Sequence, residues 1–181
     1  EIQYHIVTKA NGDGRMDESK LDGVQPLGEN EFTYHNAHVI KLQVPQIGAT
    51  QAIVYDIQAL RYCIAYAKKH NIEKPVFYVL ACRIGPFMAY FCRKIHKMGG
   101  KIYLNPDGHE WMRAKWSAPI RKYWKISEQM MVKHSDLVIC DSINIEKYIH
   151  KCYDGKGIGG RDPHTTFIAY GAETRNSQLA D

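Results

Sequence analysis

The segment NPDGHEWMRAKWSAPIRKYW, residues 105–124, places two carboxylates and an imidazole within four positions. Asp107 and Glu110 flank Gly108-His109, and Asn105-Pro106 precedes them. A turn of this composition projects side chains, because glycine removes steric cover and proline fixes the direction of the chain. A carboxylate or imidazole held there can orient or deprotonate an acceptor hydroxyl. The structural alternative is that Asp107 makes an Asx turn and Glu110 caps a helix.

Aromatic and cationic side chains follow this acid/base cluster. They are the three tryptophans of the chain and five cations with no carboxylate among them: Trp111, Trp116, Trp124, Arg113, Lys115, Arg121, Lys122 and Lys125. The third tryptophan recurs at helical spacing and is predicted to pack in the core, whereas the first two fall outside the period. Interleaved aromatics and cations are typical of a membrane interface, where cations meet anionic headgroups. Single-stranded nucleic acid is the competing partner, but no RNA-binding motif supports it.

The elements that must position these residues alternate between strands and helices. The predicted strands cover residues 4–8, 37–44, 76–81, 101–104, 137–140 and 165–169, and the predicted helices cover 49–70, 85–98, 117–134 and 144–152. Residues 10–31 are polar and rich in glycine and aspartate, which predicts a loop. This alternation indicates an α/β fold, a Rossmann-like parallel sheet with helices on both faces. The run 76–81 is continuously apolar, as expected of a strand buried on both faces.

In such a sheet, ligands gather at the carboxyl ends of the strands. Three polar segments directly follow predicted strands: Cys82-Arg83, residues 105–110 and Asp141-Ser142. We therefore expect these three segments to face one crevice.

The composition is that of an ordinary globular domain. Hydrophobic residues make up 45% of the chain and charged residues 24%, and the net charge of +5 permits anionic partners without requiring them. The five cysteines form an odd set without a CxxC pair, which argues against a disulfide framework and for a reducing compartment. The longest apolar run is far short of a membrane span.

Three motifs match known sites by letter but lack their context. Residues 155–160 read GKGIGG, but these glycines follow a predicted helix, whereas a dinucleotide fingerprint follows a strand. Residues 11–17 resemble a calcium loop without its turn glycine or flanking helices. The nine histidines contain no HxH or HxxxH pair, so no metal site is predicted.

The run ACRIGPFMAYFCRKIHKMGGKIYLNPDGHEWMRAKWSAPIRKYWKISEQMMVKHSDLVICDSINIEKYI, with TTFIAYGAE after it, resembles the bacterial rhamnosyltransferases of glycosyltransferase family four. It is most similar to capsule and cell-wall β-1,4-rhamnosyltransferases, which carry a DGxEWxRxKW signature. The resemblance extends from about residue 4 to residue 173. It implies a GT-B enzyme, in which two Rossmann-like domains enclose a cleft.

The resemblance implies that residues 1–173 form the N-terminal, acceptor-side domain and that residues 174–181 begin an interdomain linker or tail. A first strand with a glycine-rich loop should precede Glu1, and the C-terminal domain that holds the nucleotide-sugar should follow. The implied reaction transfers L-rhamnose from dTDP-L-rhamnose to a lipid-linked saccharide, without a cofactor or metal ion. The implied location is cytoplasmic, peripheral on the inner face of the cell membrane, with no nucleic-acid partner. This chain by itself should be inactive.

The resemblance also assigns roles to residues. Asp107 and Glu110 are the predicted catalytic pair for acceptor hydroxyls; the predicted acceptor-binding residues are Arg83, Asn105, His109, Arg113, Lys115 and Trp116, and Arg121 and Lys122 form the predicted membrane or pyrophosphate patch. Many relatives have a histidine in place of Asp107, so this residue does not simply inherit its role. Two alternatives stay open: a basic α/β nucleic-acid-binding module, and a nucleotide-sugar epimerase or dehydrogenase domain, which needs a glycine fingerprint on its first strand.

Overall fold

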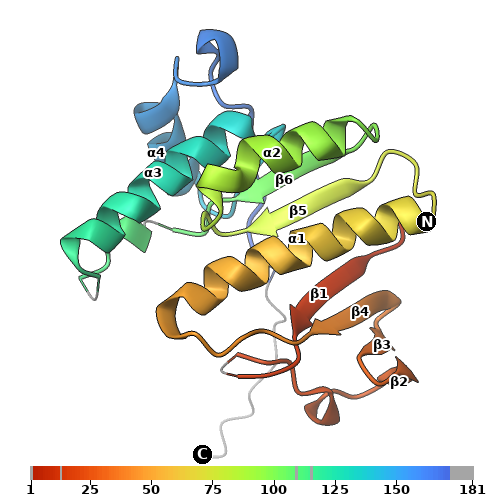
Figure 1. Ribbon diagram of the computed structural model, residues 1–181. Coiled ribbons are helices and arrows are strands. Elements are labelled where there is room, and N and C mark those ends of the chain that lie inside the picture. Colours follow the sequence, from red (N-terminus) through yellow and green to blue (C-terminus); the bar gives the residue numbers. More distant parts are fainter. Residues whose placement is uncertain (1, 13, 109, 115, 172–181) are drawn as a thin grey trace, which may run out of the picture. The chain divides into compact units, whose positions relative to one another are not determined.

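The computed structural model describes residues 2–12, 14–108, 110–114 and 116–171 (Figure 1). The chain forms two compact units: residues up to 77 together with 93–101, and residues 78–92 together with the chain from residue 102 onward. The helices lie where the sequence predicts them: α1 (Gln51–Lys69), α2 (Gly85–His96), α3 (Ala118–His134) and α4 (Ile143–Tyr153). Short 3-10 turns are η1 (Glu18–Lys20), η2 (Gly48–Thr50), η3 (Glu110–Met112) and η4 (Ile158–Gly160).

The first sheet is mixed and has the strand order β1-β4-β3-β2. Its strands are β1 (His5–Lys9), β2 (Gln25–Gly28), β3 (Glu31–Tyr34) and β4 (Ala37–Leu42); β1 is parallel to β4, and β3 is antiparallel to β2 and β4. The prediction that residues 10–31 form only a loop is therefore wrong for β2. That strand is fully exposed, contains a proline and a glycine, both of which are depleted in strands, and has no apolar alternation. His35 and Asn36 both have positive φ, as a tight two-residue hairpin turn requires.

The second sheet is parallel and has the order β5-β6-β7-β8. Its strands are β5 (Val76–Leu80), β6 (Lys101–Asn105), β7 (Leu137–Cys140) and β8 (Thr165–Phe167). Helices flank this sheet, which confirms the predicted α/β, Rossmann-like class (Figure 1). Within the second unit the core is aliphatic and sulfur-rich, and its fully buried members include Ile84, Met88, Ile102, Leu104, Met131 and Val138.

The start of α2 packs directly against α3. A Cβ atom on Gly85 would lie 2.4 Å from the Cα atom of Ser127, so a larger side chain there has no room. The Ser127 hydroxyl accepts a hydrogen bond from the Gly85 N–H (2.8 Å) and donates one to the Cys82 carbonyl (2.7 Å). This contact fixes the segment that follows β5 and carries Arg83.

One face of β5 is more exposed than the sequence predicts. Phe77 is buried, but Val76, Tyr78 and Leu80 are 54%, 48% and 58% exposed. The prediction of a strand buried on both faces is therefore wrong for one face. A continuous apolar run gives no period from which the two faces could be told apart.

Two of the motifs that lacked context are loops in the structure, as predicted. The glycines at 155–160 lie between α4 and β8, where Gly155, Gly159 and Gly160 have positive φ. In the calcium-like segment, the Asn11 side chain bonds both backbone groups of Val44, and Asp17 caps η1. These side chains stabilise their own turns, and Asp13 lies outside the described residues.

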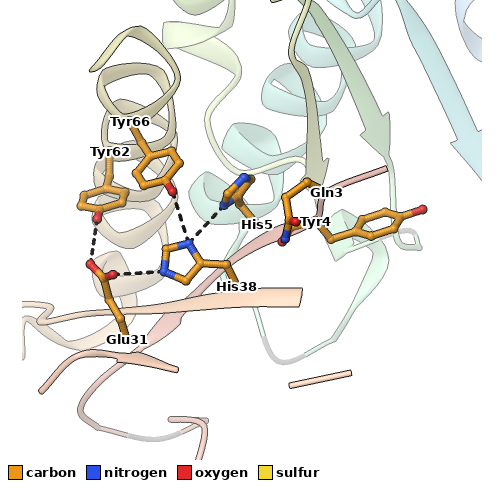
Figure 2. A network of polar contacts seen from close by, with 7 residues as sticks. All are labelled: Gln3, Tyr4, His5, Glu31, His38, Tyr62 and Tyr66. Atoms are coloured by element: carbon orange, nitrogen blue, oxygen red, sulfur yellow. Dashed lines mark hydrogen bonds and ion pairs between the residues drawn. The ribbon is translucent and has the colours of Figure 1, made fainter. Parts of the chain in front are cut away.

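A polar cluster joins α1 to the first sheet (Figure 2). His5 of β1 and His38 of β4 are register partners, and their Nδ1 atoms lie 3.2 Å apart. His38 Nε2 lies 3.0 Å from Glu31 Oε2, and the Tyr66 hydroxyl lies 3.5 Å from His38 Nδ1. When a neutral His38 donates through Nε2 to the carboxylate, its Nδ1 accepts, and the donor between the two rings is then His5 Nδ1. Only one proton fits between the two Nδ1 atoms.

This geometry agrees with the direction in which the protein shifts the pKa of His5. Burial, followed by the nearby His38 and His70 rings, lowers this pKa below its ordinary value of 6.5. The unfolded chain therefore binds more protons than the folded chain between the lowered pKa and 6.5. Stability is fully present above about pH 6.5 and falls as the pH drops toward the lowered pKa.

We predict that His5→Gln reduces the loss of stability on acidification. Urea unfolding followed by circular dichroism between pH 7.5 and 5 should show a smaller fall in midpoint for the variant than for the parent. His164→Gln, which removes an exposed histidine of the second unit, should keep the parental pH dependence. An identical pH dependence in His5→Gln and the parent would contradict the prediction.

Candidate functional site

The carboxyl end of β6 is organised by one buried amide. Asn105 is 3% exposed, and its Oδ1 accepts a hydrogen bond from the Asp107 N–H (2.8 Å). Its Nδ2 donates to the hydroxyls of Tyr78 (3.3 Å) and Tyr170 (3.4 Å), and its carbonyl accepts from the Ala81 N–H (2.9 Å). Residues from β5, from the end of β6 and from the chain after β8 therefore meet at Asn105.

Asp107 follows in a left-handed conformation with φ of 58°. Its side chain is exposed, and no described residue forms a hydrogen bond or ion pair with its carboxylate. The Asx turn of this loop is made by Asn105 and not by Asp107, so the structural alternative for Asp107 does not hold. The Asp107 carboxylate therefore lies at the end of β6, while the hydrogen bond of the turn is made by Asn105.

The electrostatics place further groups close to Asp107. Burial raises the pKa of the Cys82 thiol well above its usual value, and the Glu128 and Asp107 carboxylates raise it further. Tyr170 is 73% exposed, but partial desolvation of its hydroxyl, followed by the charge of Asp141, raises its pKa. Cys82, Asp107 and Asp141 belong to the three segments that were predicted to face one another, and the structure brings them together around Asn105 and Tyr170.

Glu110 has a different role from Asp107. Its Oε1 accepts a hydrogen bond from the Trp116 indole N–H (2.8 Å), and its Oε2 pairs with Nε of Arg113 at 3.0 Å. Glu110 lies in the first turn of η3, and both of its oxygens bind residues of the same loop. These bonds shape the loop, but they are bonds to side chains and not the helix cap that the structural alternative assigned to Glu110.

The tryptophans are held from inside the protein. The Trp111 indole donates to the Tyr148 hydroxyl (3.0 Å), and the ammonium group of Lys125 lies 4.6 Å from the centroid of the Trp111 ring. Trp116 packs beside Trp124, with ring centroids 6.1 Å apart. Trp124 is buried, as its helical spacing predicts. The indole N–H groups of Trp111 and Trp116 thus bind protein atoms and do not point freely into solvent.

The remaining predicted site residues are spread over the second unit. Arg83 is half-buried after β5, and its carbonyl accepts a hydrogen bond from the Tyr123 hydroxyl (2.8 Å). Arg121 and Lys122 are exposed in the first turns of α3. His109 and Lys115 lie outside the described residues.

Sequence reasoning missed several residues that build this site. Tyr78 and Tyr170 bind Asn105, and Tyr148 binds Trp111, across 27 to 65 positions of sequence. Spacing within one segment does not reveal such partners. Glu128 did carry a signal, because it lies four residues after Trp124 on the face of α3 that is predicted to be buried.

Two properties of the described residues bear on the class of site. They contain no group of three or more His, Cys, Asp or Glu side chains arranged to hold a metal ion. No helix within the described ranges is long and apolar enough to span a membrane.

These observations define a Rossmann-like α/β domain with a polar, carboxylate-bearing loop at the carboxyl end of a parallel sheet. The chain belongs to the family described as "Domain of unknown function (DUF1972)", whose model matches residues 1–173. This domain is associated with the N-terminal regions of glycosyltransferases. A comparison with curated proteins gives no match to the chain.

We predict that Asn105→Ala destabilises the chain by about 2 kcal/mol, because it leaves the Asp107 N–H and two tyrosine hydroxyls without their partner. Asn105→Ser keeps a short side-chain acceptor for the Asp107 N–H, as serine does in turns of this kind, and adds no charge, so it should cost less. Urea unfolding of both variants checks this order of stabilities. Equal stability of Asn105→Ala and the parent would show that the amide does not hold the strand end.

Proposed function

We propose that this chain is the acceptor-binding domain of a glycosyltransferase. The observation that carries the proposal is the exposed Asp107 carboxylate, held at the end of a parallel strand while Asn105 satisfies the turn. Ligands of open α/β sheets bind at this edge, outside the carboxyl ends of the strands. The association of the family with glycosyltransferase N-terminal regions supports the same conclusion.

A carboxylate suits a sugar hydroxyl because it only accepts hydrogen bonds, and such charge-assisted bonds are the stronger ones. Asp107 would accept from a hydroxyl of the saccharide and orient it, or take its proton during transfer. The Tyr170 hydroxyl and the Asp141 carboxylate near it would add further partners. Glu110, in this proposal, shapes the loop and does not touch the saccharide.

The finer proposal is a rhamnosyltransferase that moves L-rhamnose from dTDP-L-rhamnose to a lipid-linked saccharide. It rests on the DGxEWxRxKW pattern, which this chain carries from Asp107 to Trp116. The donor would bind mainly to a second domain. Rhamnose transfer by the 181-residue chain by itself would therefore contradict this proposal.

The substitution that isolates the Asp107 carboxylate is Asp107→Asn. Alanine would be strained at a φ of 58°, whereas asparagine tolerates the left-handed region. Losing a charged hydrogen bond, worth about 1.5–3 kcal/mol, should weaken saccharide binding by roughly 10- to 100-fold. Isothermal titration with a hexose linked by pyrophosphate to a short polyprenyl chain measures the effect.

The matched control is Asp22→Asn, which removes an exposed carboxylate from a loop of the first unit. It should bind as the parent does, and both variants should retain the parental unfolding midpoint. Parental affinity in Asp107→Asn would remove the main support for acceptor binding at this loop.

We also propose that the exposed cations of α3 face the membrane that carries the acceptor. Arg113 pairs with Glu110 and Lys125 lies over Trp111, so these two cations are already engaged within the protein. Arg121 and Lys122 are exposed and are the stronger candidates for anionic headgroups or a pyrophosphate.

Replacing Arg121 and Lys122 together with Gln should weaken binding to anionic vesicles by about 2 kcal/mol at low salt, at about 1 kcal/mol for each cation. The difference should shrink as salt is raised, because screening shortens the range of the attraction. Vesicle co-sedimentation measures it, with the Lys147→Gln and Lys151→Gln pair on α4 as a control of equal charge. If the two double variants bind equally, the α3 cations have no special role at the membrane.

A further inference from the structure

A buried carboxylate lies behind the candidate site loop. Glu128 of α3 is 3% exposed, and its Oε1 accepts hydrogen bonds from the hydroxyls of Tyr148 (2.6 Å) and Tyr153. Tyr148 and Tyr153 both belong to α4. Tyr148 in turn accepts the indole N–H of Trp111 (3.0 Å), which lies in η3 directly after Glu110. A chain of hydrogen bonds therefore runs from the core of the second unit to the loop.

The donors and acceptors along this series of hydrogen bonds follow from the chemistry of Trp111 at one end and Glu128 at the other. An indole N–H only donates, so the Tyr148 hydroxyl accepts from Trp111, and its own proton is left to donate to Glu128 Oε1. Burial, followed by the Glu128 carboxylate, raises the pKa of both tyrosines above its ordinary value, which keeps their hydroxyls protonated. Bonds of this kind polarise one another, and in a buried setting each strengthens the next.

The same tryptophan is held on a second side. The Lys125 ammonium group lies 4.6 Å from the centroid of the Trp111 ring. With its N–H bonded at the edge and a cation over the face, the ring has little freedom to turn. Glu110 precedes Trp111 in the chain and binds Arg113 and Trp116, so a change at Trp111 reaches the whole η3 loop.

We propose that Glu128 and Tyr148 are positioning residues, which act through Trp111 to preset the η3 turn beside Asp107 for the saccharide ligand of this site. The inference rests on the proposed function for the identity of the ligand. It adds Glu128 and Tyr148, which lie outside the loop, to the residues on which ligand affinity depends. A preset loop loses less freedom on binding, so the hydrogen bonds from η3 and α4 would raise affinity without touching the ligand.

The two tyrosines of α4 provide a matched pair of variants. Tyr148→Phe removes a hydroxyl that binds both Glu128 and Trp111, whereas Tyr153→Phe removes one that binds the same carboxylate and lies beside Tyr148 but does not itself bond Trp111. Both delete a single oxygen from a tyrosine that donates to Glu128. If Tyr148 and Tyr153 only stabilise the fold, the two variants should have the same effect on the Trp111 signal and on ligand affinity.

The first measurement is the indole region of a proton–nitrogen NMR spectrum, in which Trp111→Phe identifies the Trp111 signal. Tyr148→Phe should shift this signal and speed its exchange with solvent, while Tyr153→Phe leaves both close to the parent. The second measurement is titration with the polyprenyl-pyrophosphate-linked hexose. Tyr148→Phe should bind about fivefold more weakly, the worth of one ordinary hydrogen bond, and Tyr153→Phe should bind as the parent does.

The outcomes separate this inference from the proposed function. An unchanged Trp111 signal in Tyr148→Phe, or equal loss of affinity in the two variants, overturns the positioning role. Absence of hexose binding in the parent overturns the proposed function, and the Trp111 signal then still decides whether Tyr148 holds the loop. Thermal unfolding midpoints confirm that both variants are folded at the temperature of the titration.

Discussion

The site depends on the need to satisfy a buried amide at the end of a strand. A polar group taken out of water is costly unless it finds hydrogen-bond partners, and Asn105 is almost fully buried. Its side chain bonds the backbone of Asp107 and the hydroxyls of Tyr78 and Tyr170. These bonds determine where the chain turns after β6 and therefore where the Asp107 carboxylate points. Because Asn105 makes the turn, Asp107 is left available for a ligand.

Three carboxylates of the second unit have different roles because their surroundings differ. Glu128 is buried and bound by two phenols, and Glu110 is half-buried and bound by Trp116 and Arg113. Asp107 is exposed and has no such partner among the described residues. A ligand would replace water at Asp107, whereas at the other two it would have to displace protein bonds. Glu110 was the plausible second acid in the sequence, and its bonds within the loop make it a support.

The alternation of strands and helices was predictable because long helices with apolar stripes and short apolar strands each have a clear period. The second sheet, its helices and the burial of Trp124 follow from that pattern. The hairpin strand β2 was not predictable, since Gln25-Pro26-Leu27-Gly28 has neither alternation nor β propensity. Pairing with β3 creates that strand, which means that tertiary context outweighs local preference there.

The structure gives the predicted residues of this loop different surroundings. The sequence predicted that Asp107, Glu110 and Trp116 contact the acceptor and that Trp111 and Trp116 belong to an interfacial surface. The structure instead ties Trp111 to Tyr148 and Trp116 to Glu110. Tyr148 lies 37 positions away in the sequence, so no local rule could have paired it with Trp111.

This arrangement explains why aromatic, cationic and acidic residues occur together after β6. Short 3-10 turns such as η3 have weak internal hydrogen bonds and need outside support to hold one conformation. The indoles supply it, since each combines a large apolar ring with one N–H that selects a partner. Arg113 pairs with the Glu110 carboxylate, and the ammonium group of Lys125 covers the Trp111 ring. If the ligand is a saccharide on a membrane anchor, the flexible anchor lets the saccharide adjust its own position as it binds. The loop at the strand end then does not have to move, so a rigid loop suits such a ligand.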